Sequence, residues 1–363
     1  MNRLLCIVVS LDAGGAETFL MKVFRALPED YKLDFIVFRS NGIYESEVVS
    51  LGGKIYKVPT HSEHPLRAFR SIYNIVKNNK YKNILKLSDT PIGVFDLVAA
   101  RMAGAKHLCV RSCNAASDCS RVKTIINTVL RPLFNYLAKV KVAPSELAGR
   151  FTFGDTEFDK GNVTILRNGL NLSEYQFDKE KREIIREKYQ IQNKFVIGNV
   201  GRFTSQKNHA FLLDVFREIT KQNPDAILLL VGDGELKQQL VEKAKQIGVY
   251  DKIVFAGLQK DVVAYYSAMD VYVHTSLYEG MPNTIIEAQA TNLNCLISDT
   301  ITREANVTGL VSYLPLKDPQ IWASQVKSTK MNNRQGISEE MCRNGYSIDD
   351  VRANFCRLFF EED

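Results

Sequence analysis

A chain of 363 residues is longer than one ordinary domain, and its 45% hydrophobic share allows two domains to bury a core each. No apolar run reaches the ~18–20 residues that a membrane-spanning helix needs, so no such helix is expected. The first apolar run, residues 4–9, is shorter than a signal-peptide core and has no small-residue cleavage site after it. We therefore interpret it as a buried strand and expect a protein of the cytosol.

The net charge of +6 is uneven along the chain. Residues 1–165 hold 23 Lys and Arg against 15 Asp and Glu, whereas the remainder holds 24 against 26. Two interpretations of the basic half stay open: it faces an anionic membrane or acceptor, or it is a solvated surface without a dedicated partner. Candidates for a peripheral contact with the inner membrane are Arg67, Arg70, Arg121 and Lys123, although no amphipathic anchor is clear.

The cysteines are odd in number, without a Cys-x-x-Cys pair or a histidine at ligand spacing. This pattern argues against a disulfide framework and against a zinc site, so buried or loop thiols are expected. Basic runs with interleaved aromatics are missing, so nucleic acid is not expected as a partner. The seven cysteines are Cys6, Cys109, Cys113, Cys119, Cys295, Cys342 and Cys356.

Short apolar runs alternate with helical patterns, which is typical of βαβ units and parallel sheets. In the first half, strands are expected at residues 4–9, 33–38, 54–58, 84–87, 107–110, 140–143 and 163–166. Helical patterns separate them at residues 16–26, 65–79, 94–103 and 124–137. In the second half, strands are expected at residues 195–201, 226–232, 252–256, 271–274 and 295–298. The fold class predicted is therefore α/β, with two doubly wound Rossmann-like domains in series.

The predicted boundaries follow changes in composition. Residues 1–172 form the first domain, and the charged stretch 173–193 is interpreted as a linker with a short surface helix. Residues 194–337 form the second domain. Residues 338–363 are expected to be terminal helices, which could pack back on the first domain.

Doubly wound sheets bind ligands beyond the carboxyl ends of their strands, where helix N-termini present free N–H groups. Gly14 and Gly15 follow the first strand and would let the backbone approach a ligand closely, although a plain tight turn explains them equally well. Gly232 and Gly234 resemble the start of a dinucleotide fingerprint, but Lys237 stands where the third glycine should be. Binding of NAD is therefore only weakly indicated.

The turn after the first strand of the second domain carries two cations, Arg202 and Lys207, behind Gly201. A guanidinium offers a planar fork to two oxygens, and an ammonium offers a compact charge. Such a pair suits a diphosphate and can neutralise it as a leaving group without a metal. Ordinary surface cations at a helix start are the alternative.

A second turn carries two glutamates, Glu279 and Glu287, on either side of Gly280-Met281-Pro282-Asn283-Thr284. Pro282 is tolerated in a first helical turn, so Glu279 should lie on the loop and Glu287 about two turns into the helix. Glu279 could then accept hydrogen bonds from sugar hydroxyls, and Glu287 from a ribose. One cap and one surface glutamate are the alternative.

Together these motifs resemble the retaining family 4 glycosyltransferases of the GT-B fold, in which two such domains face each other across a cleft. The glutamate pair resembles the family signature, Gly201-Arg202 with Lys207 its diphosphate clamp, and Asn168-Gly169 its interdomain turn. Residues 255–271 resemble its path from the base-binding loop towards the glutamates. Residues 296–304 resemble members that build bacterial exopolysaccharide or capsule.

The resemblance implies that Arg202, Lys207 and Glu279 are the catalytic residues of a retaining, metal-independent transferase that needs no cofactor. It implies a nucleotide-sugar donor, with UDP as the expected nucleotide, and a saccharide or polyprenyl-linked acceptor. The donor would bind the second domain and the acceptor the first. The substrate-binding residues that it implies are Gly14, Gly15, Gly201, Gly232, Leu258, Gly280, Met281, Pro282, Asn283, Thr284 and Glu287.

The acceptor side departs from the family pattern. The family commonly carries a histidine on a loop of the first domain, where this chain has Arg111 to Asn114. Arg111 and Asn114 are therefore only weak candidates for contacts with the acceptor. Four other functions stay open: a sugar-nucleotide epimerase, a phosphorylase, a non-catalytic nucleotide-sugar-binding partner of another transferase, and, as the weakest, an NAD-dependent dehydrogenase.

Overall fold

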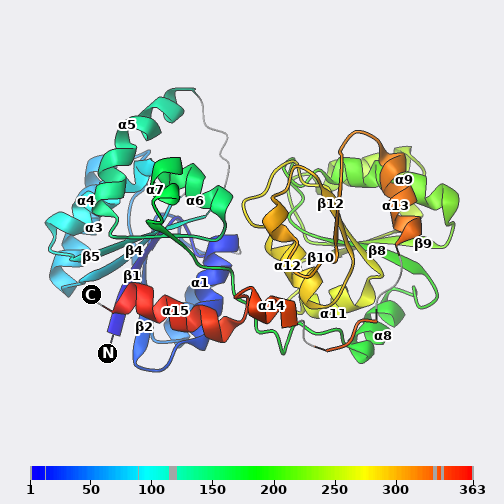
Figure 1. Ribbon diagram of the computed structural model, residues 1–363, viewed down its shortest axis with the longest axis horizontal. Coiled ribbons are helices and arrows are strands. Elements are labelled where there is room, and N and C mark those ends of the chain that lie inside the picture. The colour runs from blue at the N-terminus through cyan, green and yellow to red at the C-terminus, as the bar shows by residue number, and fades with distance from the viewer. Residues whose placement is uncertain are drawn as a thin grey trace. The chain divides into compact units, whose positions relative to one another are not determined.

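The computed structural model describes residues 2–12, 14–88, 90–113, 121–329, 333–336 and 339–361, with the side chains of 121–123 left undescribed. These residues form two compact units. Unit 1 comprises Met1–Leu170 and Gly345–Asp363, and unit 2 comprises Asn171–Asn344. Figure 1 shows each unit as a central sheet with helices on both faces, as the alternation of apolar runs and helical patterns predicts.

The sheet of unit 1 has seven described strands in the order β3-β2-β1-β4-β5-β6-β7, and all its pairings are parallel. Alternate residues of β1 enter different cores: Leu4 and Cys6 on one face, Leu5 and Ile7 on the other. All seven predicted strands are present. They are β1 (Asn2–Val8), β2 (Tyr31–Val37), β3 (Ile55–Lys57), β4 (Asn83–Ser88), β5 (His107–Ser112), β6 (Val140–Ala143) and β7 (Val163–Ile165).

The helices of unit 1 form two layers. One core joins the sheet to α1 (Gly15–Ala26), α2 (Glu45–Ser50) and α15 (Ile348–Phe360). The other core joins its second face to α3 (Pro65–Asn79), α4 (Val94–Met102), α5 (Arg121–Leu137) and α6 (Glu146–Phe153). Two short elements complete the unit, α7 (Asp155–Asp159) and the 3-10 turn η1 (Pro91–Gly93).

The last helix, α15, belongs to the core of unit 1 although unit 2 precedes it in the sequence (Figure 1). Its residues Val351, Phe355 and Phe359 are buried, and the Phe355 ring centroid lies 6.2 Å from that of Phe19 on α1. The chain re-enters unit 1 beside the place where it left, because the amide of Leu170 donates to the carbonyl of Tyr346 at 2.8 Å.

The sheet of unit 2 is also parallel throughout, with six described strands in the order β10-β9-β8-β11-β12-β13. Five of them were predicted. The sixth, β13 (Val311–Leu314), is four residues long and half-buried at the sheet edge, which leaves little signal in the sequence. The other five are β8 (Phe195–Val200), β9 (Ala226–Val231), β10 (Ile253–Gly257), β11 (Val271–His274) and β12 (Cys295–Ser298).

Helices cover both faces of this sheet. On one face the core includes α9 (His209–Gln222), α10 (Lys237–Gln246) and α13 (Pro319–Ser328), which contributes the buried Trp322. On the other face it includes α8 (Lys179–Lys188), α11 (Val262–Ala268) and α12 (Asn283–Ala290). Three short elements remain, η2 (Tyr250–Lys252), η3 (Arg303–Ala305) and α14 (Glu339–Arg343).

Helix α8, which lies in the charged stretch 173–193, is fixed to unit 2 by two arginines. Arg182 donates to the carbonyls of Ser267, Ala268 and Met269 at the end of α11, where the last carbonyls of a helix lack intrahelical donors. Its guanidinium and that of Arg186 also bind the two oxygens of Asp270, at 2.5 and 2.7 Å. This stretch therefore packs into unit 2.

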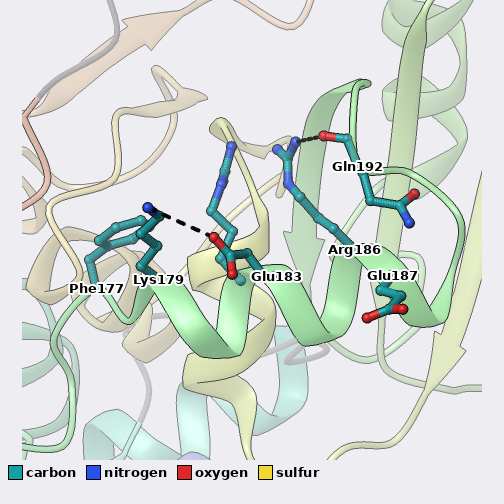
Figure 2. Close-up of a pocket in the computed structure, with 7 residues that line it drawn as sticks. Phe177, Lys179, Glu183, Arg186, Glu187 and Gln192 are labelled. Carbon is teal, nitrogen blue, oxygen red and sulfur yellow. Dashed lines mark hydrogen bonds and ion pairs between the residues drawn. The ribbon is translucent and has the colours of Figure 1, made fainter.

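Figure 2 shows the pocket that α8 borders, in which Lys179 pairs with Glu183 and the guanidinium of Arg186 donates to the carbonyl of Gln192. Arg182 and Arg186, which line this pocket, already donate to backbone carbonyls at the end of α11. We therefore assign the pocket a structural role. The lining residues are Phe177, Lys179, Arg182, Glu183, Arg186, Glu187 and Gln192.

We predict that Asp270→Ala destabilises unit 2 by about 3–5 kcal/mol, because two largely buried guanidinium groups would lose their only carboxylate partner among the described residues. Urea unfolding followed by the fluorescence of Trp322, the single tryptophan of the chain, would report this unit alone. The control is Asp225→Ala, which removes an exposed carboxylate paired with Lys194 and should hardly move the midpoint. Equal midpoints for both variants would contradict the prediction.

Candidate functional site

The strand order of unit 2 changes direction between β8 and β11, which are neighbours in the sheet. The chain winds from β8 outward to β10 on one side, then crosses to β11 and winds outward on the other. The loops that follow β8 and β11 therefore diverge, and ligands of open parallel sheets bind at such switch points. Both main motifs of the sequence lie on these two loops.

The loop after β8 lies against the end of β9. The amide of Gly201 donates to the carbonyl of Val231 at 2.9 Å, and that of Phe203 to Asp233 at 3.0 Å. Gly232 has a φ of +139°, and a Cβ placed there would lie 2.0 Å from the Gly201 carbonyl oxygen. Only glycine allows this approach, so Gly232 holds the loop that carries Arg202 and Lys207 in place.

The loops after β8 and β11 are tied to each other. The amide of Leu277 donates to the carbonyl of Gln206 at 2.8 Å, and the Gln206 side chain donates back to the carbonyl of Tyr278 at 2.9 Å. The hydroxyl of Thr275 donates to the carbonyl of Asn208 at 3.0 Å. These bonds hold the loop that carries Lys207 in register with the loop that carries Glu279.

Glu279 is the centre of the site. Its Oε1 accepts from the ammonium of Lys207 at 2.5 Å, from the hydroxyl of Ser276 at 2.7 Å and from Nε2 of His274 at 3.1 Å. The side chain of Glu279 is 9% exposed and that of Lys207 is 19% exposed. Within the described residues no hydrogen bond is made to the other oxygen, Oε2, so Glu279 keeps one acceptor for a ligand.

The electrostatics of this cluster favour an ionised Glu279. Burial alone would raise the pKa of its carboxyl, but the hydrogen bond from His274 and the charge of Lys207 outweigh it and lower the pKa to about 2. Burial lowers the pKa of His274, so its ring is neutral near pH 7. Its Nε2 then carries the proton that Glu279 accepts, and its Nδ1 lies 3.1 Å from the hydroxyl of Tyr272, which also bonds the carbonyl of Val200 at 3.2 Å.

The segment between the two glutamates begins helix α12. Pro282 is the N-cap residue, with φ −79° and ψ 98°, and Asn283 is the first helical residue. The first turn carries no acidic side chain, so no carboxylate there neutralises the partial positive charge at the N-terminus of the helix. Gly280, Met281 and Pro282 are buried, whereas Asn283 and Thr284 are half-buried.

Glu287 lies two turns into α12 and is 9% exposed. Its carboxylate accepts from the hydroxyls of Tyr175 at 3.3 Å and Tyr266 at 3.2 Å. Burial and the charge of Glu287 raise the pKa of both tyrosines, so both remain protonated donors. The two hydroxyls fix the rotamer of the Glu287 side chain, which would be variable at a solvent-exposed position.

Two predicted residues at the rim of the site are exposed. The Arg202 side chain is 76% exposed and its Nε lies 3.7 Å from Glu235. Leu258, directly after β10, is 80% exposed. Neither contributes to the core, so the fold leaves both side chains accessible to a ligand.

The remaining predicted residues lie in unit 1. Gly14 is the N-cap of α1, at the β1/β4 switch point of that sheet, and Gly15 is the first helical residue. Arg111 is 1% exposed, with its guanidinium 3.8 Å from the Phe19 ring centroid and 2.5 Å from Asn168 Oδ1. The structure thus places Arg111 inside the core of unit 1, where it has no surface to offer an acceptor. Asn114 lies outside the described residues.

Four side chains of the site were missed from the sequence: His274, Ser276, Tyr175 and Tyr266. His274 is the last residue of β11 and Ser276 lies two residues beyond it, at the switch point, and that position was a usable signal. Tyr175 lies in the charged stretch before α8 and Tyr266 on α11, so only tertiary packing brings them to Glu287.

Comparison with known proteins decides the family. Residues 181–309 match the family described as "Glycosyl transferases group 1". The chain is 32% identical over 362 residues to "Putative glycosyltransferase EpsF" of Bacillus subtilis, covering 95% of this chain and 93% of that protein. The chain belongs to the group 1 glycosyl transferases.

Two further likenesses extend over most of this group 1 glycosyltransferase. One is to "UDP-Gal:alpha-D-GlcNAc-diphosphoundecaprenol alpha-1,3-galactosyltransferase" of Escherichia coli, 25% identical and covering 79% of this chain and 76% of that protein. The other is to the crystal structure of Anabaena Alr3699/HepE in complex with UDP and glucose, with a TM-score of 0.78, 18% identity and coverage of 98% and 99%. The predicted GT-B fold is thereby confirmed.

The described part of this glycosyltransferase has neither a membrane-spanning helix nor a cluster of metal ligands. No helix there combines the length and the apolar character that crossing a bilayer requires. No three side chains among its described His, Cys, Asp and Glu residues gather as a metal site would require.

We predict that the ionised Glu279 makes the stability of unit 2 depend on pH in the acid range. Because its pKa falls from 4.5 to about 2 on folding, the stabilisation is complete above about pH 5 and is lost as the pH falls towards 2. Between these limits the wild type should lose roughly 3 kcal/mol more unfolding free energy than Glu279→Gln, which cannot titrate. Urea unfolding followed by Trp322 fluorescence measures this difference.

The matched control is Glu242→Gln, at an exposed position of α10. It should follow the pH profile of the wild type. A Glu279→Gln profile that coincides with the wild type would show that this carboxylate is not held ionised.

Proposed function

We propose that this glycosyltransferase moves a sugar from a nucleotide-diphosphate sugar to a saccharide acceptor, with retention at the anomeric carbon and without a metal. The observation that carries the proposal is the Lys207–Glu279 contact at the β8/β11 switch point of unit 2. It sets a cation and an acceptor oxygen side by side where an open parallel sheet binds its ligand.

In this proposal the cations of the loop after β8 bind the diphosphate. The ammonium of Lys207 has three donors, of which Glu279 uses one, and the exposed guanidinium of Arg202 supplies a planar fork. Negative charge develops on the diphosphate as its bond to the anomeric carbon breaks. Two cations beside the diphosphate stabilise that charge, which lowers the barrier to transfer.

The two glutamates hold the rest of the donor. Oε2 of Glu279 accepts from a sugar hydroxyl, while Oε1 stays bonded to Lys207, Ser276 and His274. Glu287, fixed by Tyr175 and Tyr266, accepts from the ribose hydroxyls. Gly201, Gly232, Leu258 and the start of α12 complete the donor site.

Retention follows if the acceptor oxygen attacks from the face that the diphosphate leaves. The new bond forms between that oxygen and the anomeric carbon, the bond to the diphosphate breaks, and the diphosphate oxygen takes the hydroxyl proton. No protein base is needed in this scheme, which is compatible with a first domain that lacks the family's histidine.

Support for the acceptor class comes from the relatives. The E. coli relative is named for a diphosphoundecaprenol-linked acceptor and a UDP-sugar donor. We extend this to a polyprenyl-linked saccharide acceptor and a UDP-sugar donor for this chain, in the biosynthesis of exopolysaccharide or capsule. Gly14 and Gly15, at the switch point of unit 1, are the residues that we assign to the acceptor side.

We predict that one class of nucleotide sugar raises the melting temperature of the protein in a screen of UDP-, GDP- and ADP-sugars, because a ligand of the native state stabilises it. We expect a UDP-sugar to give the largest shift. The shift should disappear in Arg202→Ala, whose side chain is too exposed to support the fold. Equal melting temperatures with all three classes would contradict the proposed donor site.

We predict that Arg202→Ala and Lys207→Ala each lower turnover by about 10²–10³-fold, because each removes one cation from the leaving diphosphate. The assay is single-turnover transfer to a polyprenyl-diphosphate saccharide. Arg217→Ala, a half-exposed arginine on α9 away from the loop, is the matched control and should keep wild-type turnover.

Other outcomes would select other functions. Binding of a nucleotide sugar with no transfer to any acceptor would indicate a non-catalytic partner of another transferase. Epimerised donor without added acceptor would indicate an epimerase. Wild-type turnover in both cation variants would refute the assigned roles.

A further inference from the structure

Helix α5 has apolar side chains on two opposite faces. One face packs into unit 1 through Phe134, which is 0% exposed, and through Leu130 and Leu137, which pack against the same core. The opposite face presents a set of large hydrophobic side chains to solvent, which we name the α5 stripe. It consists of Ile125, Ile126, Val129, Leu133 and Tyr136, with exposures of 64%, 39%, 71%, 47% and 82%.

The spacing of the α5 stripe makes it one continuous surface. Positions 125, 129, 133 and 136 recur every three or four residues, so their side chains lie above one another along the helix. A helix that buries one apolar face in its own domain gains nothing from a second one in water. A contiguous exposed apolar surface of this kind marks a contact with another phase or molecule.

The same helical layer exposes further large apolar side chains outside α5. Helices α3, α4 and α5 share one core on the same face of the sheet (Figure 1). Phe95 and Met102 on α4 are 50% and 64% exposed. Exposed apolar side chains are therefore present on both α4 and α5.

The charge of this layer is of one sign. Asp96 is the sole acidic residue in the sequences of α3, α4 and α5, and it is 2% exposed and paired with Lys86 at 2.8 Å. The layer therefore exposes basic side chains and no carboxylate within its described helices. The exposed basic residues are Arg67, Arg70 and Lys77 on α3 and Arg101 on α4.

We propose that the α3–α5 layer binds the surface of an anionic lipid bilayer, with the α5 stripe inserted among the headgroups. Apolar insertion and attraction of basic side chains to anionic lipid are the two contributions that hold interfacial helices on membranes. A second copy of the chain fits less well, because a symmetric contact through this layer would bring its arginines together. The proposal does not depend on the sugar chemistry, since binding is measured without donor or acceptor.

The layer also explains how a soluble catalytic unit would meet a lipid-linked acceptor. A protein held at the bilayer searches for its acceptor in two dimensions. Binding through α3–α5 would raise the local concentration of a polyprenyl-linked saccharide at unit 1. This consequence, unlike the binding itself, rests on the proposed function.

The test is flotation of the full chain with vesicles of phosphatidylcholine, alone or mixed with phosphatidylglycerol. The wild type should partition onto the mixed vesicles at least about tenfold more strongly than onto the neutral ones. Val129→Asp should lower the partition coefficient by about tenfold, because it places a charge in the inserted stripe. Arg67→Glu with Arg70→Glu should abolish the preference for phosphatidylglycerol.

The matched control is Val49→Asp. Val49 is 61% exposed on α2, in the helical layer on the opposite face of the sheet, so this variant should bind like the wild type. Sedimentation of all variants without lipid reports their oligomeric state. Absent binding by the wild type, equal binding by Val129→Asp, or a wild-type dimer that Val129→Asp converts to a monomer would overturn the proposal.

Discussion

The contact between Lys207 and Glu279 depends on two loops that leave neighbouring parallel strands in opposite directions. The loop from β8 and the loop from β11 would separate if their backbones were not bonded to each other through Gln206 and Thr275. A charged pair of this burial is unfavourable unless it is well paired and hydrogen-bonded. The sheet topology therefore creates the position, and the loop-to-loop bonds make a charged pair stable in it.

A cluster of polar side chains next to that pair keeps Glu279 ionised. His274 is buried at the end of β11, and its Nε2 donates a hydrogen bond to Glu279. Nearby, Asn199 bonds the carbonyl of Val273 and accepts from His209, whose pKa burial lowers to about 3. These neutral rings orient the site without adding charge to it. The net charge near the switch point is thus set by the cations of one loop and one carboxylate.

Periodicity in the sequence was sufficient for the architecture. Buried parallel strands are continuous apolar runs, and twelve of them stood out between helical patterns. The short β13 gave no such run. The charged stretch 173–193 was interpreted as a linker because its composition is polar, yet Arg182 and Arg186 bind backbone carbonyls and Asp270 of unit 2. Polarity in a sequence does not reveal whether a guanidinium ends in water or against a helix terminus.

The residues of the candidate site likewise include some that the sequence predicts and some that it does not. Lys207 and Glu279 were predictable because strand-to-helix turns at a switch point have a known use. The tyrosines that hold Glu287 were not, since they come from α11 and from the segment before α8. Arg111 was a weak candidate for the acceptor because it lies where the family commonly carries a histidine, but its buried side chain packs over Phe19. The α5 stripe was not predicted, because a helix with two apolar faces has the same sequence pattern whether its second face is buried or exposed.

The position of α15 has a consequence for biosynthesis. The first 170 residues leave the ribosome long before the helix that supplies Val351, Phe355 and Phe359 to their core. Until then the groove beside α1 and β1 exposes apolar side chains, while unit 2 is synthesised in between. Domains generally fold in the order of their synthesis, and surfaces left open during elongation are the ones that chaperones bind. Unit 2 can therefore mature first, although it is encoded second.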